Sequence, residues 1–423
     1  MTETLLDDLH WRGLIHQSTD RDALDRHLRE GPRVLYCGFD PTADSLHIGS
    51  LVPLLTLRRF QLAGHRPIAL VGGATGLIGD PSFKASERAL NEADLVGAWV
   101  GRLRSQVSAF LDLDAGARVV DNLDWTRGQD LIGFLRDVGK HFSVNEMIRK
   151  ESVRERLDRE GSGISYTEFS YMLLQSFDYV ELARQYGCTL QIGGSDQWGN
   201  ITAGMDLVRR MLGHSVHALT MPLVTKADGT KFGKTETGTV WLDARRTSPY
   251  SFHQFWLNTA DADVGRFLRL FTFLDRGAIE ALERSLVEAP QHRAAQHALA
   301  DEVTMLVHGE EALQSAQRIG QALFSGAIDA LDADDLEQLA QDGLPTLEAP
   351  DTTMRIGEVL TALELARSNS AAMQLVKSGA VSVNGHAVAE VATTLGDFGT
   401  LPGGFLLLRR GKRHWGMVKL AAS

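Results

Sequence analysis

The feature that most constrains this chain is an alternation, from about residue 33, of short β-rich apolar runs with longer stretches of helical spacing. The runs RVLYCGF (33–39), PIALVGG (67–73), ARVV (117–120) and CTLQIGG (188–194) each suit a buried strand, and a helix is expected near 47–63. Strands that alternate with helices form βαβ units, whose strands run parallel. We therefore expect an α/β domain with a mainly parallel sheet and ligand sites outside the carboxyl ends of its strands.

Beyond the sheet region, the sequence divides into three further parts. Residues 248–325 place apolar side chains at helical spacing, and 353–423 contain two predicted helices, a strand pair turning at Asn384 and Gly385, and a basic last strand. Between them, 326–352 hold eight acids, no base and two prolines, which suits an interdomain acidic linker or a small acidic subdomain. The predicted domains are 1–247, 248–325, 326–352 and 353–423.

Charge and cysteine content limit the class of protein. The chain carries −11, but residues 354–423 hold eight Lys or Arg against four acids, a charge of +4 that leaves −15 for the residues before them. A basic terminal part on an acidic body can bind nucleic acid locally. Only Cys37 and Cys188 occur, which excludes a disulfide framework and paired-cysteine zinc sites. With no basic leader and no apolar span, we expect a cytoplasmic protein.

Two segments are suited to phosphate. In YCGFDPTADSLHIGS (36–50) a strand breaks at Gly38, turns at Asp40 and enters a helix near His47, where backbone donors and the side chains of Thr42 and His47 converge. In ADGTKFGKTETG (227–238) glycines surround two lysines, Lys231 and Lys234, that can close over a triphosphate. In isolation, a structural histidine and an exposed charged turn are the commoner explanations.

Three other segments add polar side chains at expected site positions. In a helix predicted over 166–187, Tyr171, Gln175 and Asp178 share one face while apolar residues cover most of the rest, as on a helix that lines a cleft. The strand end QIGGSDQWGN (191–200) suits a ligand site or, equally, a turn with a capping Asp. Lys84 and Arg88, four residues apart, could reach the phosphates or form a solvated face.

Competing motifs are absent from the sequence. GGATGLIGDPS (72–82) lacks the Gly-Lys-Ser/Thr ending of a P-loop, GGSDQ (193–197) lacks the last glycine of a nucleophile elbow, and no HExxH or EF-hand string occurs. We expect no protein-bound metal.

The motifs in combination resemble a known family. HIGS (47–50) and KFGKT (231–235) are similar to the HIGH and KMSKS signatures of class I aminoacyl-tRNA synthetases, and KFGKT matches the form found in tyrosyl enzymes. The motif order over almost the whole chain resembles bacterial tyrosyl-tRNA synthetases, with Ser50 in place of the second signature His. The resemblance implies a Rossmann-like catalytic domain, an α-helical domain that contacts tRNA, and a small α+β RNA-binding domain with the αL motif.

The resemblance also implies a reaction and its partners. L-Tyrosine and ATP, with Mg²⁺ accompanying the ATP, would give tyrosyl adenylate and pyrophosphate, and the tyrosyl group would pass to the 3′ end of tRNA(Tyr) with release of AMP. No covalent nucleophile is needed, because positioning and charge stabilisation suffice. The family is homodimeric, and residues 134–147 look like its interface sequence.

Site residues follow from the matching positions. The catalytic set implied is Thr42, His47, Lys84, Arg88, Lys231, Lys234 and Thr235. The tyrosine set is Tyr36 and Asp178 for the phenol, Asp80, Tyr171 and Gln175 for the ammonium group, and Gln191 and Gln197 at the border. The ATP set is Gly38, Asp40, Thr42, His47, Gly49, Ser50, Gly194, Asp196 and Lys234, and the RNA set is Arg367, Lys377, Arg409, Arg410, Lys412 and Arg413.

Two other classes of protein remain as alternatives. A tryptophanyl synthetase would share the fold, but the pair Tyr36 and Asp178 favours a phenol. A catalytically inactive, synthetase-like RNA-binding or splicing protein would explain Ser50, but the retained Thr42, His47 and lysines favour an enzyme.

Overall fold

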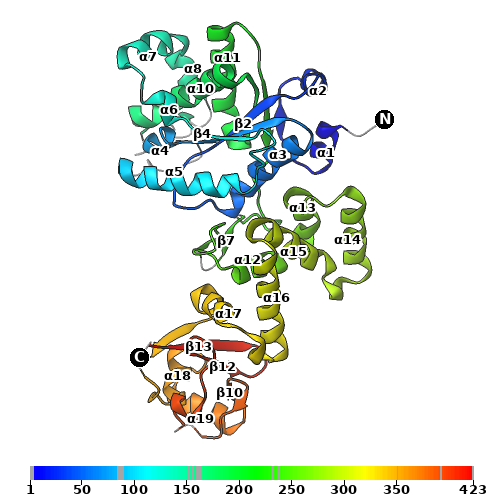
Figure 1. Cartoon of the computed structure of the whole chain (residues 1–423), viewed down its shortest axis with the longest axis vertical. Coiled ribbons are helices and arrows are strands. Elements are labelled where there is room, and N and C mark those ends of the chain that lie inside the picture. The colour runs from blue at the N-terminus through cyan, green and yellow to red at the C-terminus, as the bar shows by residue number, and fades with distance from the viewer. Residues whose placement is uncertain are drawn as a thin grey trace. The chain divides into compact units, whose positions relative to one another are not determined.

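The computed structural model describes residues 4–82, 90–150, 153–154, 157, 163–230, 232–235, 238–349, 351–390 and 393–421 (Figure 1). By its contacts the chain divides into two compact units. Unit 1 contains Met1–Leu242 and Gly265–Ile279, and unit 2 contains Asp243–Val264 and Glu280–Ser423.

Unit 1 is built on a six-stranded sheet in the order β1-β6-β5-β2-β3-β4. Every pairing is parallel except that of β1 with β6. The chain passes from β2 to β3 and β4 in one direction and then returns to place β5 on the other side of β2, so a crevice opens between β2 and β5 at their carboxyl ends. The strands are β1 Gln17–Ser18, β2 Val34–Phe39, β3 Arg66–Val71, β4 Arg118–Asp121, β5 Cys188–Gly194 and β6 His217–Met221.

Helices cover both faces of this sheet (Figure 1). On one face, Tyr36 and Ile68 share a core with residues of α10 and α11, and α3 and α5 lie against the strands on the other side. The bounds in this unit are α1 Leu5–Trp11, α2 Arg21–Arg29, α3 Leu51–Leu62, α4 Thr75–Ile78, α5 Ala93–Ser108, α6 Leu123–Thr126, α7 Leu131–Asp137, α8 Val144–Ile148, α10 Tyr166–Tyr186 and α11 Trp198–Leu212.

The helix that was predicted over 166–187 is α10, and its ends have chemical causes. Ser165 caps it by accepting a hydrogen bond from the Glu168 N–H, and Gly187 ends it in the left-handed region at φ 65°. Its Tyr171 and Asp178 are buried. Helix α10 therefore brings its polar strip against the crevice side of the sheet, as the sequence indicated.

Unit 2 combines a helical part with a second sheet. Helices α12, α15 and α16 pack on one another, and the five-stranded sheet has the order β11-β10-β12-β13-β9, in which only β9 and β13 pair in parallel. The helices are α12 Pro249–Leu257, α15 Ala294–His308, α16 Glu310–Ser325, α17 Ala333–Gln338, α18 Ile356–Ala362 and α19 Asn369–Lys377. The strands are β9 Thr346–Ala349, β10 Val381–Val383, β11 His386–Ala387, β12 Phe405–Arg410 and β13 His414–Leu420.

Helices α13 Asp261–Phe271 and α14 Arg276–Glu288 contain residues of both units. A two-stranded hairpin in unit 1, β7 Lys234–Thr235 with β8 Gly238–Thr239, carries part of the KFGKT segment. The expected turn at Asn384 and Gly385 is present, with φ values of 47° and 80°. The predicted α/β class is confirmed.

The acidic segment 326–352, expected to be a linker or a small acidic subdomain, contains regular secondary structure in its described residues. It forms α17, β9 and two single helical turns at Ile328–Ala330 and Leu339–Gly343. Asp335 is fully buried, where it accepts hydrogen bonds at 2.6 Å from Arg318 Nε and from Ser315 Oγ. The number of acids in the segment did not reveal these elements, because their formation depends on the buried apolar residues that lie between the acids at helical spacing.

Candidate active site

A cavity of about 610 Å³ opens at the carboxyl ends of β2 and β5, where the strand order reverses. Its wall includes every predicted tyrosine residue, namely Tyr36, Asp80, Tyr171, Gln175, Asp178, Gln191 and Gln197. It also includes Gly38, Asp40, Thr42, His47, Gly49, Ser50, Gly194 and Asp196 from the predicted ATP set. Lys84, Arg88 and Lys231 lie outside the described residues, as do the side chains of Lys234 and Thr235.

The deep end of the cavity contains a buried carboxyl group and a buried hydroxyl without a partner. Asp178 accepts hydrogen bonds from Asn122 Nδ2 at 3.0 Å and from Trp125 Nε1 at 2.9 Å. Burial raises the pKa of Asp178 to about 7, although both hydrogen bonds oppose that shift. The Tyr36 hydroxyl is buried and makes no hydrogen bond, and burial raises its pKa well above the usual value, so it keeps its proton. A ligand hydroxyl placed here would satisfy both groups.

Asn122 and Trp125, which hold the Asp178 carboxyl group, were not among the residues predicted from the sequence. They follow β4 directly, at the same carboxyl edge of the sheet as the cavity, and Asn122 also accepts a hydrogen bond from the Ala74 N–H at 2.7 Å. No motif marks them. The available signal was their position just after the predicted strand at 117–120.

The middle of the cavity is acidic and strongly hydrogen-bonded. Tyr171 donates its hydroxyl to Asp40 Oδ2 at 2.7 Å, and Thr75 donates to Asp40 Oδ1 at 2.6 Å. Gln197 Nε2 donates to Asp80 Oδ2 at 2.8 Å and to Asp196 Oδ2 at 3.0 Å. Three carboxyl groups in one wall attract a cation such as an ammonium group.

Two glutamine oxygens beside this acidic wall also lack partners. The Oε1 atoms of Gln175 and Gln191 are buried and make no hydrogen bond in the structure. Both residues line the same cavity. An ammonium group, with three donors, could supply the missing hydrogen bonds.

The HIGS and KFGKT segments are brought together by backbone hydrogen bonds. Ile48 N–H donates to the Val240 carbonyl at 3.1 Å, and Val240 N–H donates to the Gly233 carbonyl at 3.0 Å. Gly233 has φ 81°, and a side chain there would approach Ile48 Cγ1 to 3.0 Å, so glycine permits the contact. His47 begins the helical turn Ile48–Ser50, and its Nδ1 accepts a hydrogen bond from the Gly49 N–H at 3.0 Å. The two predicted phosphate segments therefore form one rim of the cavity.

A second glycine fixes the floor near the predicted ribose position. A side chain at Gly194 would come within 2.3 Å of Asp196 Oδ1. The Asp196 carboxylate can therefore keep its present position against the end of β5 because Gly194 lacks a Cβ atom.

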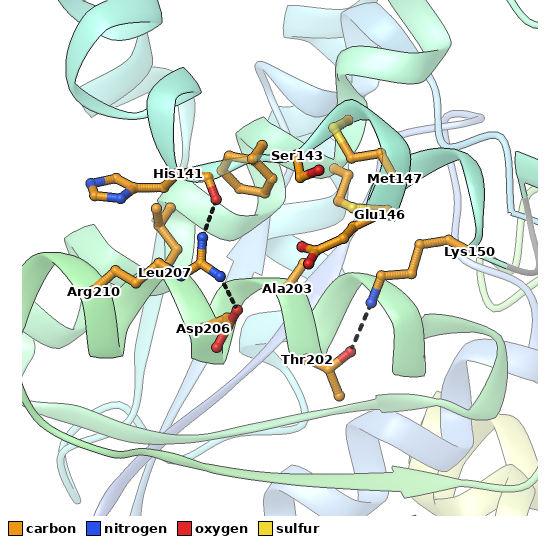
Figure 2. Close-up of a pocket in the computed structure, with 12 residues that line it drawn as sticks. His141, Ser143, Glu146, Met147, Lys150, Thr202, Ala203, Asp206, Leu207 and Arg210 are labelled. Atoms are coloured by element: carbon orange, nitrogen blue, oxygen red, sulfur yellow. Dashed lines mark hydrogen bonds and ion pairs between the residues drawn. The ribbon is translucent and has the colours of Figure 1, made fainter.

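A smaller cavity of about 80 Å³ lies between α8 and α11 (Figure 2). Lys150 points toward Thr202 with Nζ 3.5 Å from its Oγ1, and Arg210 donates to the His141 carbonyl while it pairs with Asp206 at 2.9 Å. These contacts dock the segment 139–150 on α11. They leave the outer side of the segment uncovered.

Four of the six predicted RNA-binding residues gather at one hairpin of unit 2. Arg409 and Arg410 end β12, and the exposed Lys412 and Arg413 lie in the turn before β13. Arg409 lies 4.9 Å above the Trp415 ring, which is packed in the core with an exposed fraction of 9%. Trp415 therefore packs rather than presenting its face to a base.

Arg410 links this hairpin to the segment before α19. Its Nη1 donates to the Leu365 carbonyl at 2.8 Å. Arg367 follows two residues later and is exposed, and Lys377 is exposed in the last turn of α19.

Metal and membrane features are limited in the described part of the chain. Among those residues, no group of three or more His, Cys, Asp or Glu side chains is arranged to hold a metal ion. None of the helices in the described ranges is long and apolar enough to cross a bilayer.

Two family models match most of the chain. Residues 28–325 match the family model described as tRNA synthetases class I (W and Y), and residues 335–418 match that of the tyrosine–tRNA ligase SYY-like C-terminal domain. The fold is therefore that of a class I aminoacyl-tRNA synthetase of the tryptophan and tyrosine group.

Full-length relatives narrow this class. The tyrosine–tRNA ligase of Aliivibrio salmonicida is 61% identical over 415 residues, which are 97% of each chain, and that of Dechloromonas aromatica is 55% identical over 98% of each. The C-terminally truncated mitochondrial tyrosyl-tRNA synthetase of Aspergillus nidulans superposes with a TM-score of 0.70 at 30% identity, covering 76% of this chain and 94% of that one. The chain belongs to the tyrosine–tRNA ligase family, which confirms the resemblance drawn from HIGS and KFGKT.

A more distant structure shows the fold alone. The tyrosyl-tRNA synthetase of Archaeoglobus fulgidus, solved with L-tyrosine, has a TM-score of 0.57 at 16% identity and covers 74% of this chain and 99% of that one. The comparisons support the ligase and not the inactive RNA-binding protein that Ser50 left open.

Proposed function

We propose that this chain, as a tyrosine–tRNA ligase, performs the activation of L-tyrosine in the cavity at the ends of β2 and β5. The observation that carries the proposal is the unpartnered, buried hydroxyl of Tyr36 beside the buried carboxyl of Asp178. A phenol oxygen between them would accept one hydrogen bond and donate the other. Phenylalanine would fill the same space and leave both groups unsatisfied.

The rest of the amino acid would lie along the acidic wall. The ammonium group would meet Asp80, Tyr171 and Gln175, with Gln191 and Gln197 at its border. Asp80 is already held by Gln197, so the carboxylate is oriented before the ligand arrives. Such preorganisation lowers the entropic cost of placing the tyrosine carboxylate against ATP.

ATP would bind at the rim formed by HIGS and KFGKT, as its magnesium complex. Gly194 and Asp196 would hold the ribose, and Gly38, Asp40, Gly49 and Ser50 would border the nucleotide. Donors to the phosphates would be Thr42, His47, Lys231, Lys234 and Thr235, with Lys84 and Arg88 from the neighbouring segment.

The reaction would then proceed in two displacements. A tyrosine carboxylate oxygen attacks the α-phosphorus, and the bond to pyrophosphate breaks as charge builds on the departing oxygen, where the lysine and threonine donors stabilise it. A ribose hydroxyl at the 3′ end of tRNA(Tyr) next attacks the tyrosyl carbonyl carbon. AMP leaves with the bonding electrons, and the hydroxyl proton is lost.

The test is tyrosine-dependent exchange of labelled pyrophosphate into ATP. We expect exchange with tyrosine and not with tryptophan or phenylalanine. Asp178→Ala should abolish it, because two buried donors, Asn122 and Trp125, lose their acceptor along with the ligand. Exchange by Asp178→Ala at the wild-type rate would refute the assignment of the phenol site.

The RNA part of the proposal places tRNA on the basic hairpin of unit 2. Lys412 and Arg413 are exposed, and the hydrogen bond described for Lys412 is made by its backbone carbonyl, which accepts from Arg409. Reversing both charges, Lys412→Glu with Arg413→Glu, should raise the KM for tRNA(Tyr) in aminoacylation and flatten its salt dependence. Pyrophosphate exchange should be unchanged, and an unaltered KM for tRNA would contradict the assignment.

A homodimer is the third part of the proposal, and its support is an uncovered apolar surface. Helix α7 buries none of its residues, and Leu131 and Ile132 are each 68% exposed. Val144 and Ile148 of α8 are 58% and 40% exposed on a segment that α11 anchors from the other side. A patch of this kind marks an interface between copies.

Sedimentation tests the interface. We expect a dimer at micromolar concentration, a monomer for Ile132→Asp, and a dimer for Val287→Asp, whose side chain is 82% exposed in the part of α14 that belongs to the other unit. A monomeric wild-type protein would refute the proposal. A cytoplasmic location belongs to the same proposal and is supported by Cys37 and Cys188, both buried as free thiols.

A further inference from the structure

The aromatic residue of the KFGKT segment is packed on a helix rather than presented to solvent. The Phe232 ring stacks on Phe271 with centroids 5.1 Å apart and an interplanar angle of 21°. It meets Phe267 edge-on at 5.0 Å, and Phe267 and Phe271 meet each other at 5.7 Å. Three rings in offset and edge contact form a directional cluster, because aromatic quadrupoles favour these geometries.

The two partner rings are fixed from behind. Phe267 and Phe271, one helical turn apart on α13, have exposed fractions of 2% and 0%. Arg59 is itself buried and donates at 2.5 Å to the carbonyl of Thr272, the residue after the helix ends. Arg12 donates to the same carbonyl at 3.3 Å and to the Leu274 carbonyl at 2.9 Å.

These arginines secure the carboxyl end of α13 in a chemically specific way. The last carbonyls of a helix lack partners within it and carry the negative end of its dipole. In the last turn of α13, the Arg269 carbonyl accepts hydrogen bonds from Arg12 at 3.3 Å and from Arg59 at 3.5 Å. Burial and the nearby Arg12 lower the pKa of Arg59 to about 9, which still leaves it charged near neutral pH. Helix α13 is therefore a firm support within unit 1.

The loop is held by this support at two points. Arg266 donates to the carbonyl of Thr225, which precedes the loop, and Phe232 lies within it. On its other side the loop is linked to HIGS through Val240, which donates to the Gly233 carbonyl and accepts a hydrogen bond from the Ile48 N–H. Phe232 also lines the large cavity, so the packed ring is itself part of the cavity wall.

We propose that Phe232 is a positioning residue for the activation step: its packing on Phe267 and Phe271 holds the KFGKT loop beside HIGS while the pyrophosphate departs. This inference rests on the proposed role of the loop in ATP binding. The inference assigns part of the function of the loop to Phe232, whose side chain has no polar atom, and it identifies α13 as the element that supports the loop.

The test is the kinetics of adenylate formation by Phe232→Ala, with the number of competent sites measured by active-site titration. We expect kcat/KM for ATP to fall at least tenfold, while KM for tyrosine changes less than twofold, because the described hydrogen bonds of Asp178 are made with Asn122 and Trp125 and not with the loop. Phe232→Met should lie within about threefold of wild type, since the thioether fills an apolar gap of similar size. A purely structural defect would instead lower the titrated sites and leave KM for ATP unchanged.

A double-mutant cycle identifies the partner. If the rings act together, Phe232→Ala combined with Phe271→Leu should be no slower than the slower single variant. Losses in kcat/KM for ATP that multiply in the double variant would overturn the proposal. Phe324→Ala, whose side chain is 85% exposed on α16, is the matched control and should exchange like wild type.

Lys234→Ala separates this inference from the function on which it depends. We expect its exchange to fall by at least tenfold. Wild-type exchange by Lys234→Ala would refute the proposed role of the loop itself. An impaired Lys234→Ala beside an unimpaired Phe232→Ala would refute only the positioning role of the ring.

Discussion

Removing a single oxygen from the cavity should change stability and binding in opposite directions. In Tyr36→Phe the hydroxyl that makes no hydrogen bond is deleted from a site that is fully buried. An unsatisfied buried hydroxyl costs about 1–3 kcal/mol, so the ligand-free variant should be at least as stable as wild type. Tyrosine, however, would lose one hydrogen bond of about 0.5–1.5 kcal/mol, which weakens its binding roughly 2- to 13-fold.

The neighbouring tyrosine supplies a matched control. Tyr179 is equally buried, its ring centroid is 5.2 Å from that of Tyr36, and its hydroxyl donates to the His217 carbonyl at 2.7 Å. Tyr179→Phe deletes the same atom but leaves a carbonyl without its donor, so it should lower stability by about 1 kcal/mol and leave tyrosine binding unchanged.

Thermal melting of both ligand-free variants and KM for tyrosine in pyrophosphate exchange are the measurements. Phenylalanine should compete better in Tyr36→Phe, since one fewer polar group is left unsatisfied by it. If Tyr36→Phe melts as far below wild type as Tyr179→Phe does, the hydroxyl has a partner in the free protein. If tyrosine binds Tyr36→Phe as tightly as wild type, the phenol does not contact this residue.

Three further outcomes follow from other buried groups. The pKa of Asp178 is raised to about 7, so kcat/KM for tyrosine should rise with pH through that value as the carboxylate forms. Trp125→Phe removes a hydrogen bond that lowers this pKa, so the rise should move to higher pH in that variant. A pH profile that does not move over pH 6–9 would show that Asp178 is not its origin. The pKa of His27 is lowered from 6.5 to about 4 by burial and by Arg33, so the contribution of the neutral imidazole to stability is complete above pH 6.5 and declines as the pH falls toward 4. Over that pH range, the melting temperature of His27→Gln should decline less than that of wild type. Parallel curves for the two proteins would show that another group is responsible. Arg318→Ala leaves the buried Asp335 carboxylate without its cationic partner, and it should destabilise unit 2 by about 2 kcal/mol, a value reduced for the partial exposure of Arg318. On heating this variant, aminoacylation should therefore be lost at a lower temperature than pyrophosphate exchange.

Local sequence patterns were sufficient wherever one segment carried its own signal. The strand predicted at 188–194 is β5 to the residue, because an apolar run there lies between Gly187, which ends α10, and a turn. The polar strip of α10 was predicted from spacing alone and lines the cavity. The HIGS and KFGKT motifs were recognisable, but their connection through the backbone of Val240 was not, since it depends on how the sheet brings distant segments together.

Two features were beyond such reasoning for physical reasons. The hydrogen bonds from Asn122 and Trp125 to Asp178 join residues more than 50 positions apart. An asparagine or a tryptophan after a strand can donate to many acceptors, so the residue types do not identify a partner in α10. The acidic segment was judged by its total charge, whereas its structure depends on where single acids lie. Asp335 is buried against Arg318 and Ser315, and Asp332 caps α17.

The pairing of β9 with β13 has a consequence for how this protein could be shortened or recombined. Strand β9 comes from the acidic segment and pairs along Met417–Leu420 of β13, so it covers what would otherwise be an open border of the C-terminal sheet. A fragment beginning at residue 353 would expose that border together with the apolar face that holds Phe405, Leu407 and Met417 against α16 and α17. Unpaired borders of this kind recruit strands from other molecules. A gene fusion or truncation that divides the chain after β9 would therefore yield a C-terminal fragment that aggregates. A chimaera that takes its C-terminal part from a relative should therefore take α16 from the same relative.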